Sequence, residues 1–442
     1  MPGALLTDLY ELNMAASYLR RGMHAEATFS LYVRTLPPQR GFVVVAGLES
    51  SLAFLDAFSF ADDELAYLAE SGFDREALEA FRDLRFTGDV RAVPEGRIVY
   101  ADEPILEVTA PIAAAQLVET YLLNQVTLHT TLATKAARYV VAAGGRDLVD
   151  FAFRRTHGTE AAMAAARASA IVGFVATSNV EAARRFGLRV AGTMAHSYIE
   201  AFPSEAEAFR AFAEDFPGRT TFLVDTYDTP NGVRTAIETA RELGLTENIG
   251  VRLDSGNLLE LSRTARDLLD EAGFPDARIF ASGGLDELEV EELVSGGAPV
   301  DAFGIGTQMG VSADAPYIDS VYKLVEYDGR PVLKLSSKKA TAPGPKQVFR
   351  GFEGDLLALR DEPGPPGAEP LLDLVMRRGS RVSASPSMER MRERFRHDLA
   401  GVPQHALRLR DPGAVMVRHS GELVALTNRA REEALRRAGL PS

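Results

Sequence analysis

The sequence predicts an α/β protein built around an irregular βα barrel of the TIM type, flanked by an N-terminal α+β domain and a C-terminal sheet-containing domain. Between residues 147 and 323, short β-branched apolar runs alternate with helical stretches about every 20–30 residues. Strands that alternate with helices pair in parallel through right-handed crossovers. The seven apolar runs are DLVDFAF, AIVGFVA, LRVAGTM, TTFLVD, IGVRLD, RIFAS and DAFGIG. With an eighth strand expected at SVYKLVEY (320–327), they favour a barrel over an open sheet.

The flanking segments have a different pattern. Residues 7–21 read as a helix and 27–34 as a strand, and 89–111 alternate with frequent Pro and Gly, as antiparallel sheets do. One or two apolar helices are expected over 111–143, and an Asp-Gly turn at 328–329 predicts a hairpin. The expected divisions are an N-terminal domain (1–110), a helical lead-in with the barrel (111–325), and a C-terminal hairpin, sheet and helices that pack back on the N-terminal domain (326–442).

Composition limits the classes of function. The 442 residues are 46% hydrophobic and 25% charged, which is typical of a globular protein, and the net charge of −14 opposes binding to nucleic acid or anionic membranes. No apolar run is long enough to span a bilayer, and MPGALLTDLYELNM does not resemble a signal peptide. The absence of cysteine excludes disulfides and thiolate chemistry, so we expect a cytoplasmic protein.

Lysine is rare and clustered. Five of the six lysines fall between residues 323 and 346, whereas arginine supplies the other basic charges. The cluster is either a chance feature of a surface hairpin or a set of compact ammonium groups for phosphate. Lys338 and Lys346 are the candidate phosphate ligands.

Two glycine motifs follow consecutive predicted strands, ASGGL at 281–285 and FGIGT at 303–307. Glycine lets backbone N–H groups approach a phosphate, and the late strands of a barrel are the usual phosphate site, although each motif could also be only a tight turn. The candidate phosphate-binding residues are Gly283, Gly284, Gly304, Gly306 and Thr307.

Charged side chains end the preceding strands. In VRLDSGN, alternation places Arg252 and Asp254 on one face, where they could hold phosphate, ribose hydroxyls or Mg²⁺, or form an internal ion pair. FLVDTYDTPNG adds Asp225 as a candidate ligand. In the same segment, Asp228 is as consistent with a helix cap before Pro230 as with a ligand.

Histidine and aromatic residues complete the expected rim. His196 in TMAHSY lies at a strand end among small residues, in a position where a functional role competes evenly with a structural one. DFAFRRTHG supplies Phe151 and Arg154, an aromatic face and a cation suited to a flat anionic ring, or else a core pair with surface arginines. Since strict alternation puts these two on opposite faces, the chain must bend after Phe153. His157 also occupies a rim position.

Taken in order, these motifs resemble the nicotinate phosphoribosyltransferase family. The resemblance begins with TDLYELNMA (7–15), continues through FSLYVRTLPPQRGFVVVAGLE (29–49) and the motifs above, and ends near LKLSSKKATAPGPKQVFR (333–350). It implies a type II phosphoribosyltransferase, a homodimer with shared active sites, that joins nicotinate to phosphoribosyl pyrophosphate. ATP is implied as a co-substrate hydrolysed through a phosphohistidine, and Mg²⁺ as a cofactor.

The resemblance also assigns residues. His196 matches the phosphorylated histidine, and Phe151 and Arg154 match positions that bind the ring. Tyr10 is implied to reach in from the partner subunit. The positions that match substrate or phosphate contacts are Arg34, Arg252, Asp254, the glycines above and the lysine-rich segment. Mg²⁺ would be bound mainly by phosphates, with Asp254 as a weak ligand.

Several alternatives remain open at this stage. Nicotinamide-using relatives carry an acid at the end of the second strand, where this chain has Ser178; an acid would repel a carboxylate, so Ser178 favours nicotinate. A quinolinate-using enzyme is usually shorter and lacks TMAHS. A non-catalytic ligand-binding relative is another alternative. Without the resemblance, the residues indicate a barrel enzyme acting on a phosphorylated sugar.

Overall fold

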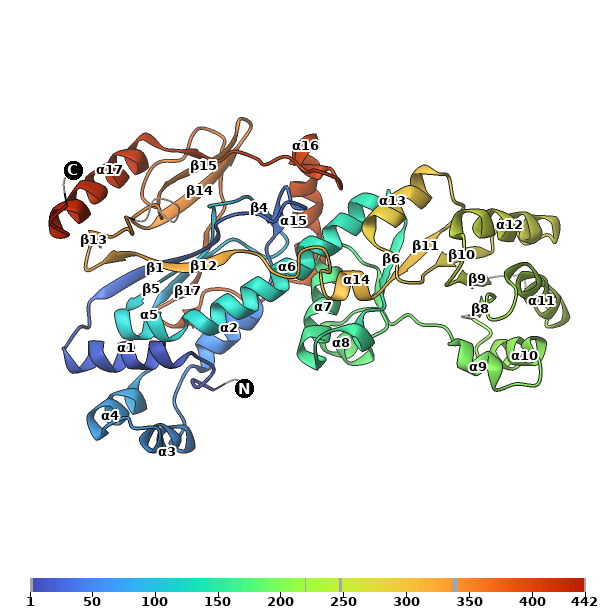
Figure 1. The fold of residues 1–442 in the computed structure, drawn as a ribbon, viewed down its shortest axis with the longest axis horizontal. Coiled ribbons are helices and arrows are strands. Elements are labelled where there is room, and N and C mark those ends of the chain that lie inside the picture. The colour runs from blue at the N-terminus through green and yellow to red at the C-terminus, as the bar shows by residue number, and fades with distance from the viewer. Residues whose placement is uncertain (1–2, 219, 246–248, 336–340, 441–442) are drawn as a thin grey trace. The chain divides into compact units, whose positions relative to one another are not determined.

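The chain folds into two compact units in the computed structural model, which describes residues 3–218, 220–245, 249–335 and 341–440 (Figure 1). The first unit combines residues 1–131 with 317–442, and the second contains residues 132–316. Both ends of the chain thus contribute to one unit. The sequence predicted three segments, 1–110, 111–325 and 326–442, whose boundaries differ from those of these two units.

The first unit is built on a seven-stranded antiparallel sheet with the order β13-β12-β1-β5-β3-β17-β18. Its interior strand β1 has seven buried residues out of eight, since neighbours pair along both edges and helices cover it. The strands are β1 (Glu26–Val33), β3 (Asp89–Ala92), β5 (Pro104–Pro111), β12 (Ser320–Tyr327), β13 (Arg330–Pro331), β17 (Asp373–Arg377) and β18 (Ser380–Arg381). Two smaller sheets accompany it, β2 (Val43–Val44) with β4 (Ile98–Val99), and β16-β14-β15-β19. The last contains β14 (Lys346–Gly351), β15 (Gly354–Leu359), β16 (Glu369–Pro370) and β19 (Arg418–His419).

One expected barrel strand belongs to this antiparallel sheet instead. SVYKLVEY forms β12, which pairs with β1 from Ser320 to Tyr327, so the expectation of an eighth barrel strand is wrong. The expected hairpin is confirmed, because β12 turns into β13 through Asp328 and Gly329, both with positive φ. This is the backbone that a two-residue Asp-Gly turn needs to match strand twist. Strands β12 and β13 therefore belong to the antiparallel sheet of the first unit.

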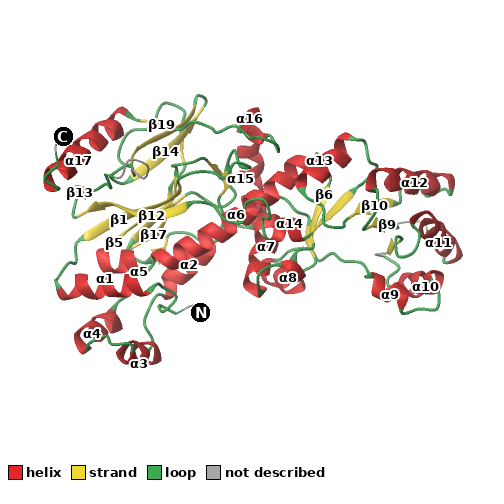
Figure 2. Ribbon diagram, in the orientation of Figure 1, coloured by secondary structure: helices red, strands yellow, loops and turns green. Residues whose placement is uncertain are grey.

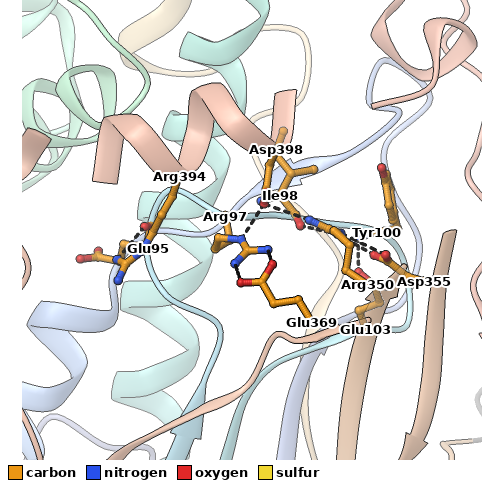
Figure 3. A network of polar contacts seen from close by, with 10 residues as sticks. All are labelled: Glu95, Arg97, Ile98, Tyr100, Glu103, Arg350, Asp355, Glu369, Arg394 and Asp398. Carbon is orange, nitrogen blue, oxygen red and sulfur yellow. Dashed lines mark hydrogen bonds and ion pairs between the residues drawn. The ribbon is translucent and has the colours of Figure 1, made fainter. Parts of the chain in front are cut away.

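Helices and a polar network close the first unit. The helices are α1 (Leu9–Arg20), α2 (Leu48–Ala57), α3 (Asp62–Glu70), α4 (Arg75–Asp83), α5 (Ile112–Leu117), α15 (Met388–Gly401), α16 (Gln404–Leu407), α17 (Gly421–Arg437) and α6 (Glu119–Ala143), which continues into the second unit. Figure 3 shows the network, centred on Asp398 of α15. One oxygen of Asp398 accepts hydrogen bonds from Arg97 (2.8 Å), Arg350 (2.9 Å) and the Ile98 N–H (2.8 Å). Helix α15 is thereby tied to segments far away in sequence.

The second unit contains a six-stranded parallel sheet with the order β7-β6-β11-β10-β9-β8. In Figure 2 its strands are surrounded by the helices that connect them. The strands are β6 (Asp147–Asp150), β7 (Ala176–Thr177), β8 (Thr221–Leu223), β9 (Gly250–Leu253), β10 (Arg278–Ala281) and β11 (Ala302–Ile305). The helices are α7 (Thr159–Ile171), α8 (Val180–Phe186), α9 (His196–Glu200), α10 (Glu205–Asp215), α11 (Thr229–Glu242), α12 (Leu258–Glu271), α13 (Glu287–Ser295) and α14 (Thr307–Gly310), with a 3₁₀ turn at Phe153–Arg155.

Among the described residues, the parallel sheet does not close into a barrel. β7 and β8 are its two edges, and the predicted strand LRVAGTM forms only a single bridge from Val190 to Thr177. The alternation of strands and helices was sufficient to predict parallel pairing, and that part of the prediction is confirmed. Closure depends on pairing between the first and last strands, which no local pattern encodes.

Capping side chains place the helices directly after the strand ends. Asn179, Asp228, Asn257 and Asp286 each accept a backbone N–H in the first turn of α8, α11, α12 and α13. The caps satisfy donors that a helix leaves free at its start. No described helix is both long enough and apolar enough to cross a membrane.

Candidate active site

The carboxyl ends of the parallel strands gather most of the predicted residues of the second unit. Parallel strands end at the same edge of a sheet, so the residues that follow β6 to β11 share one rim. Phe151 follows β6, Ser178 follows β7, Asp225 follows β8 by one residue, and Asp254 follows β9. The last two strands are followed by the two glycine motifs.

Asp254 is the centre of the polar contacts at this rim. Its Oδ1 accepts hydrogen bonds from Arg252 Nη2 at 2.6 Å and from Ser282 Oγ at 2.5 Å. Arg252 Nε also donates to Ser282 Oγ at 2.8 Å, which closes a triangle across β9 and β10. Burial would raise the pKa of Asp254, but the hydrogen bond from Ser282 and the charge of Arg252 hold it below its ordinary value. Asp254 is therefore ionised at neutral pH.

His196, the first residue of α9, lies beside this carboxylate. Its Nδ1 is 3.1 Å from Thr226 Oγ1, and its Nε2 is 3.9 Å from Asp254 Oδ2. The side chain is 41% exposed. Thr226 thus contacts one ring nitrogen, whereas Nε2 makes no hydrogen bond with the described residues.

Asp225 organises the neighbouring loop. Its Oδ2 accepts from the Asp254 N–H at 3.0 Å and from Ser255 Oγ at 2.6 Å, whereas its buried Oδ1 has no hydrogen-bond partner among the described residues. Burial, with the charges of Asp225 and Asp228, raises the pKa of Glu205 in α10 to about 7. Asp228 itself caps α11 through the Asn231 N–H (3.0 Å). Of the two roles predicted for Asp228, the helix cap is the one that the structure shows.

An aromatic floor lies on the β6 side. The rings of Phe151 and Phe280 are 5.6 Å apart, and the guanidinium of Arg252 is 5.5 Å from the Phe151 ring centre. Gly304 is buried in β11, and a Cβ there would lie 2.7–2.8 Å from both rings. The absence of a side chain at Gly304 leaves space for the Phe151 ring. Gly304 therefore has a packing role besides the phosphate-binding role predicted for it.

The chain bends between the two predicted ring-binding residues. Ala152 adopts a right-handed helical conformation, and a 3₁₀ turn follows at Phe153–Arg155. The bend therefore begins before Phe153, not after it, and removes the conflict with strict alternation. Arg154 is exposed and pairs with none of the described residues. Ser178 is half-buried, and its N–H donates to the Asp150 carbonyl at 2.8 Å.

The remaining glycines line the far end of the rim. Gly283 and Gly284 both have positive φ, and a Cβ on Gly283 would collide with the Asp254 carbonyl. Only glycine fits this approach of two loops. Gly306 and the exposed Thr307 begin α14. These residues lie where the sequence predicts phosphate binding, and their roles stay predictions.

A cavity of about 460 Å³ lies behind the aromatic floor. Phe151 and Phe280 line it together with Val149, Val190 and the first residues of several strands. Charged side chains also line it, among them Asp147, Arg189 and Arg278.

The other predicted site residues belong to the first unit or lie outside the described residues. Tyr10 begins α1, where it donates to Glu11 at 3.1 Å, and Arg34 follows β1 with Asp319 3.6 Å away. Lys338 lies outside the described residues. Lys346 is only 2% exposed, and its Nζ contacts the Gly344 carbonyl at 2.7 Å and Glu107 at 3.4 Å. This interior ion pair gives Lys346 a structural role in the first unit, and phosphate binding by Lys346 stays a prediction.

The rim offers few side-chain ligands for Mg²⁺. No group of three or more metal-binding side chains occurs among the described residues. Asp254 is ionised, its Oδ2 accepts no hydrogen bond from the described residues, and Asp225 has one unpartnered oxygen. One or two carboxylates fit an Mg²⁺ ion held mainly by substrate phosphates.

Family models match the chain along most of its length. They are the nicotinate phosphoribosyltransferase N-terminal domain over residues 5–127, the nicotinate phosphoribosyltransferase family over 147–351, and the C-terminal domain over 364–427. The chain belongs to the nicotinate phosphoribosyltransferase family. The matched core includes every rim residue described above.

Relatives and a solved structure agree with this family. The chain is 46% identical to nicotinate phosphoribosyltransferase pncB2 of Mycobacterium tuberculosis over 98% of this chain and 96% of the relative. It is also 46% identical to nicotinate phosphoribosyltransferase of Bacillus subtilis, over 81% and 76%. The crystal structure of human nicotinic acid phosphoribosyltransferase matches with a TM-score of 0.85 at 29% identity, covering 96% of this chain and 99% of that one.

Sequence reasoning missed three residues of the rim in this family member. Thr226 contacts His196, Ser282 contacts Asp254, and Asp150 accepts hydrogen bonds from the Ala152 N–H and the Thr177 hydroxyl. Ser282 could have been found, because it directly precedes the predicted glycine pair. Thr226 and Asp150 are adjacent to predicted residues, but their partners His196 and Thr177 lie on other elements, which a single sequence does not reveal.

Proposed function

We propose that this chain is a nicotinate phosphoribosyltransferase that forms nicotinate mononucleotide and pyrophosphate from nicotinate and phosphoribosyl pyrophosphate, as a step of NAD synthesis in the cytoplasm. The observation that carries the proposal is the group of His196, Arg252 and Asp254 on one rim with Phe151, in a chain that belongs to this family. The pyridine nitrogen attacks ribose C1 as the bond from C1 to the pyrophosphate oxygen breaks.

The rim residues have separate tasks in this reaction. Phe151 and Arg154 bind the ring and its carboxylate. Ser178 occupies the position at which nicotinamide-using relatives have an acid, so no acid at that position repels the carboxylate. Positioning the nitrogen near C1 and neutralising the leaving pyrophosphate account for the rate, since no protein nucleophile attacks the sugar. Arg252 and the backbone of the glycine motifs supply positive charge and donors. Bound Mg²⁺ would neutralise phosphate charge, with Asp254 and Asp225 as its protein ligands.

ATP enters the proposal as a co-substrate. The Nε2 of His196 accepts the γ-phosphoryl group, the bond from Pγ to the ADP oxygen breaks, and water later hydrolyses the phosphohistidine. Thr226 orients the ring by its contact with Nδ1, and the exposure of the side chain leaves space for a phosphoryl group. Up to two added charges beside Arg252 would strengthen the hold of basic groups around the substrates.

The proposal also includes a homodimer. Tyr10, from the first unit, would enter the site of the partner subunit. Leu6, Leu9 and Tyr10 are each about half exposed at the start of α1, which is unusual for three large apolar side chains close together. A second copy would cover this surface.

One assay tests the reaction. The full-length protein is incubated with phosphoribosyl pyrophosphate and Mg²⁺, with and without ATP, and with nicotinate, nicotinamide or quinolinate as the base. Nicotinate should yield its mononucleotide with stoichiometric pyrophosphate. A charge contact worth about 2 kcal/mol predicts a kcat/KM for nicotinate about 30-fold above that for nicotinamide. Equal use of nicotinamide, carbon dioxide released from quinolinate, or no turnover of any base would each support one of the alternatives instead.

A further inference from the structure

Asp150 is a buried acid directly beneath the proposed ring pocket. It is the last residue of β6, precedes Phe151, and is 1% exposed. Its Oδ1 accepts the Ala152 N–H at 2.9 Å, and its Oδ2 accepts the Thr177 hydroxyl at 2.7 Å. One carboxylate therefore links the ends of two neighbouring strands.

Each of these hydrogen bonds fixes a different wall of the pocket. The bond to Ala152 holds the residue at which the chain turns from Phe151 toward Arg154. On the other side, Thr177 Oγ1 also accepts the Asn179 N–H at 3.0 Å, so the hydroxyl spans the peptide that carries Ser178. The Ser178 N–H donates to the Asp150 carbonyl at 2.8 Å. Asp150 and Thr177 thus set where Phe151, Arg154 and Ser178 stand relative to one another.

The rest of the protein gives Asp150 no other task. None of the described cationic side chains pairs with it, and it does not reach the polar contacts around Asp254. Burial raises the pKa of Asp150, while the hydrogen bonds from Thr177 and Ala152 oppose that rise. A buried carboxyl group without a cation is costly to keep. The two hydrogen bonds that it accepts offset part of this cost and give the carboxylate a role in the local geometry.

We propose that Asp150 and Thr177 act together as positioning residues that determine how strongly the pocket selects a pyridine carboxylate over the corresponding amide. The inference rests on the proposed function, since it concerns the same base pocket. A shift of the two walls by about 1 Å would separate Arg154 from the carboxylate, and misplacement of that size costs on the order of 100-fold in rate.

The first test replaces the hydroxyl alone. Thr177→Val removes it at constant volume, and Thr177→Ser restores it. Thr177→Val should raise the KM for nicotinate at least tenfold and lower the nicotinate-to-nicotinamide ratio of kcat/KM. The KM for phosphoribosyl pyrophosphate should stay within twofold of the wild-type value. Thr177→Ser should recover most of the wild-type values. Thr220→Val is the matched control, because Thr220 is equally buried and its hydroxyl donates to the Phe216 carbonyl (2.9 Å) at the opposite end of a strand.

The second test is a double-mutant cycle. Asp150→Asn keeps the shape and one acceptor but cannot accept from both partners. If the two residues act as one unit, Asp150→Asn combined with Thr177→Val should lower base selectivity no further than the more severe single change. A purely structural role predicts lower melting temperatures for Thr177→Val and Thr220→Val alike with unchanged base selectivity, and that result would overturn the inference. If the wild-type protein does not convert nicotinate at all, the proposed function itself is refuted.

Discussion

Arg252 Nη2 of β9 and Oδ1 of Asp254, the residue that follows β9, are 2.6 Å apart. Side chains two residues apart in extended backbone lie on the same face, and Ser282, which follows β10, completes the contact. The pair is partly buried, and Arg252 also extends over Phe151. One guanidinium therefore connects the acid beside His196 with the aromatic floor.

Asp254→Asn should lower kcat/KM for phosphoribosyl pyrophosphate on the order of 100-fold, because it removes the charge that fixes Arg252 and the ligand that we propose for Mg²⁺. The KM for nicotinate should change much less. Steady-state kinetics with each substrate varied in turn measures both effects. Asp228→Asn is the control: this acid lies one loop away and caps α11, a position that Asn fills equally well, so activity should stay within about twofold. Equal losses in the two variants would contradict the assigned role of Asp254.

Local sequence patterns predicted much of this fold because they record which face of an element is buried. The predicted runs DLVDFAF, IGVRLD and DAFGIG contain β6, β9 and β11, and their parallel pairing follows from the helices between them. β12 has the same apolar character, yet it pairs antiparallel with β1, almost 300 residues earlier. No local pattern states which distant strand is the partner.

The site follows the same rule. Arg252 and Asp254 were predicted together because alternation along one strand is local information. The Thr226 contact with His196 joins two loops, and the burial of Lys346 depends on Glu107 in another strand. Lysine clustering indicated phosphate binding. A lysine whose ammonium group pairs with a buried carboxylate, however, cannot be told apart from a phosphate-binding lysine by sequence alone. Contacts between elements, and not residue types, distinguish these cases.

Lys346→Ala should destabilise the protein and leave the KM for phosphoribosyl pyrophosphate within about twofold. Lys346 Nζ offsets Glu107, which also pairs with Arg360, and loss of one partner of a buried ion pair typically costs about 3–5 kcal/mol. Chemical denaturation measures the loss of stability, and kinetics below the melting temperature measures KM. Lys323→Ala, in the same lysine-rich segment on β12, controls for loss of a positive charge. A stable Lys346→Ala with a strongly raised KM would restore the phosphate-binding prediction.

Glu103 should make stability depend on pH in a direction that can be stated in advance. It is fully buried beside Asp355 (Figure 3); burial, followed by the nearby Asp355, raises its pKa well above 4.5. The folded state therefore holds this proton more tightly than the unfolded chain does. The stabilising contribution is complete below about pH 4.5 and is lost as pH rises through the folded pKa.

Glu103→Gln keeps the group neutral at every pH, so the melting temperature of the variant relative to the wild type should rise as the pH increases from 5 to 9. The Gln side chain can still accept from the Tyr100 N–H and can donate to Asp355. Calorimetry in buffers of constant ionic strength measures the difference. A difference that stays constant over this range would show that Glu103 is not protonated in the folded protein.

Shared active sites predict complementation between inactive subunits. In a mixed dimer of Tyr10→Ala and His196→Ala chains, one of the two sites would contain both wild-type residues. Random exchange in an equal mixture should therefore restore about a quarter of the wild-type ATP-stimulated rate. Differently tagged subunits, purified in tandem, give the mixed dimer directly. Mixed dimers that form but remain without ATP stimulation would contradict the contribution of Tyr10 across the interface.

Phosphoryl transfer to His196 should be visible as a labelled protein. Since Thr226 holds Nδ1 and Nε2 is the accessible nitrogen, incubation with [γ-³²P]ATP should give a phosphoprotein that is labile to acid and stable to alkali, as a phosphorus–nitrogen bond is. His196→Ala should carry no label and lose the stimulation by ATP, while retaining some uncoupled transfer to nicotinate because the ring pocket is intact. His157→Ala is the matched control, because His157 is also exposed after a strand end, and it should be labelled like the wild type. Label that survives acid, or equal label in His196→Ala, would place the phosphoryl group on another residue, and loss of all nicotinate transfer in His196→Ala would make the histidine part of the transfer chemistry itself.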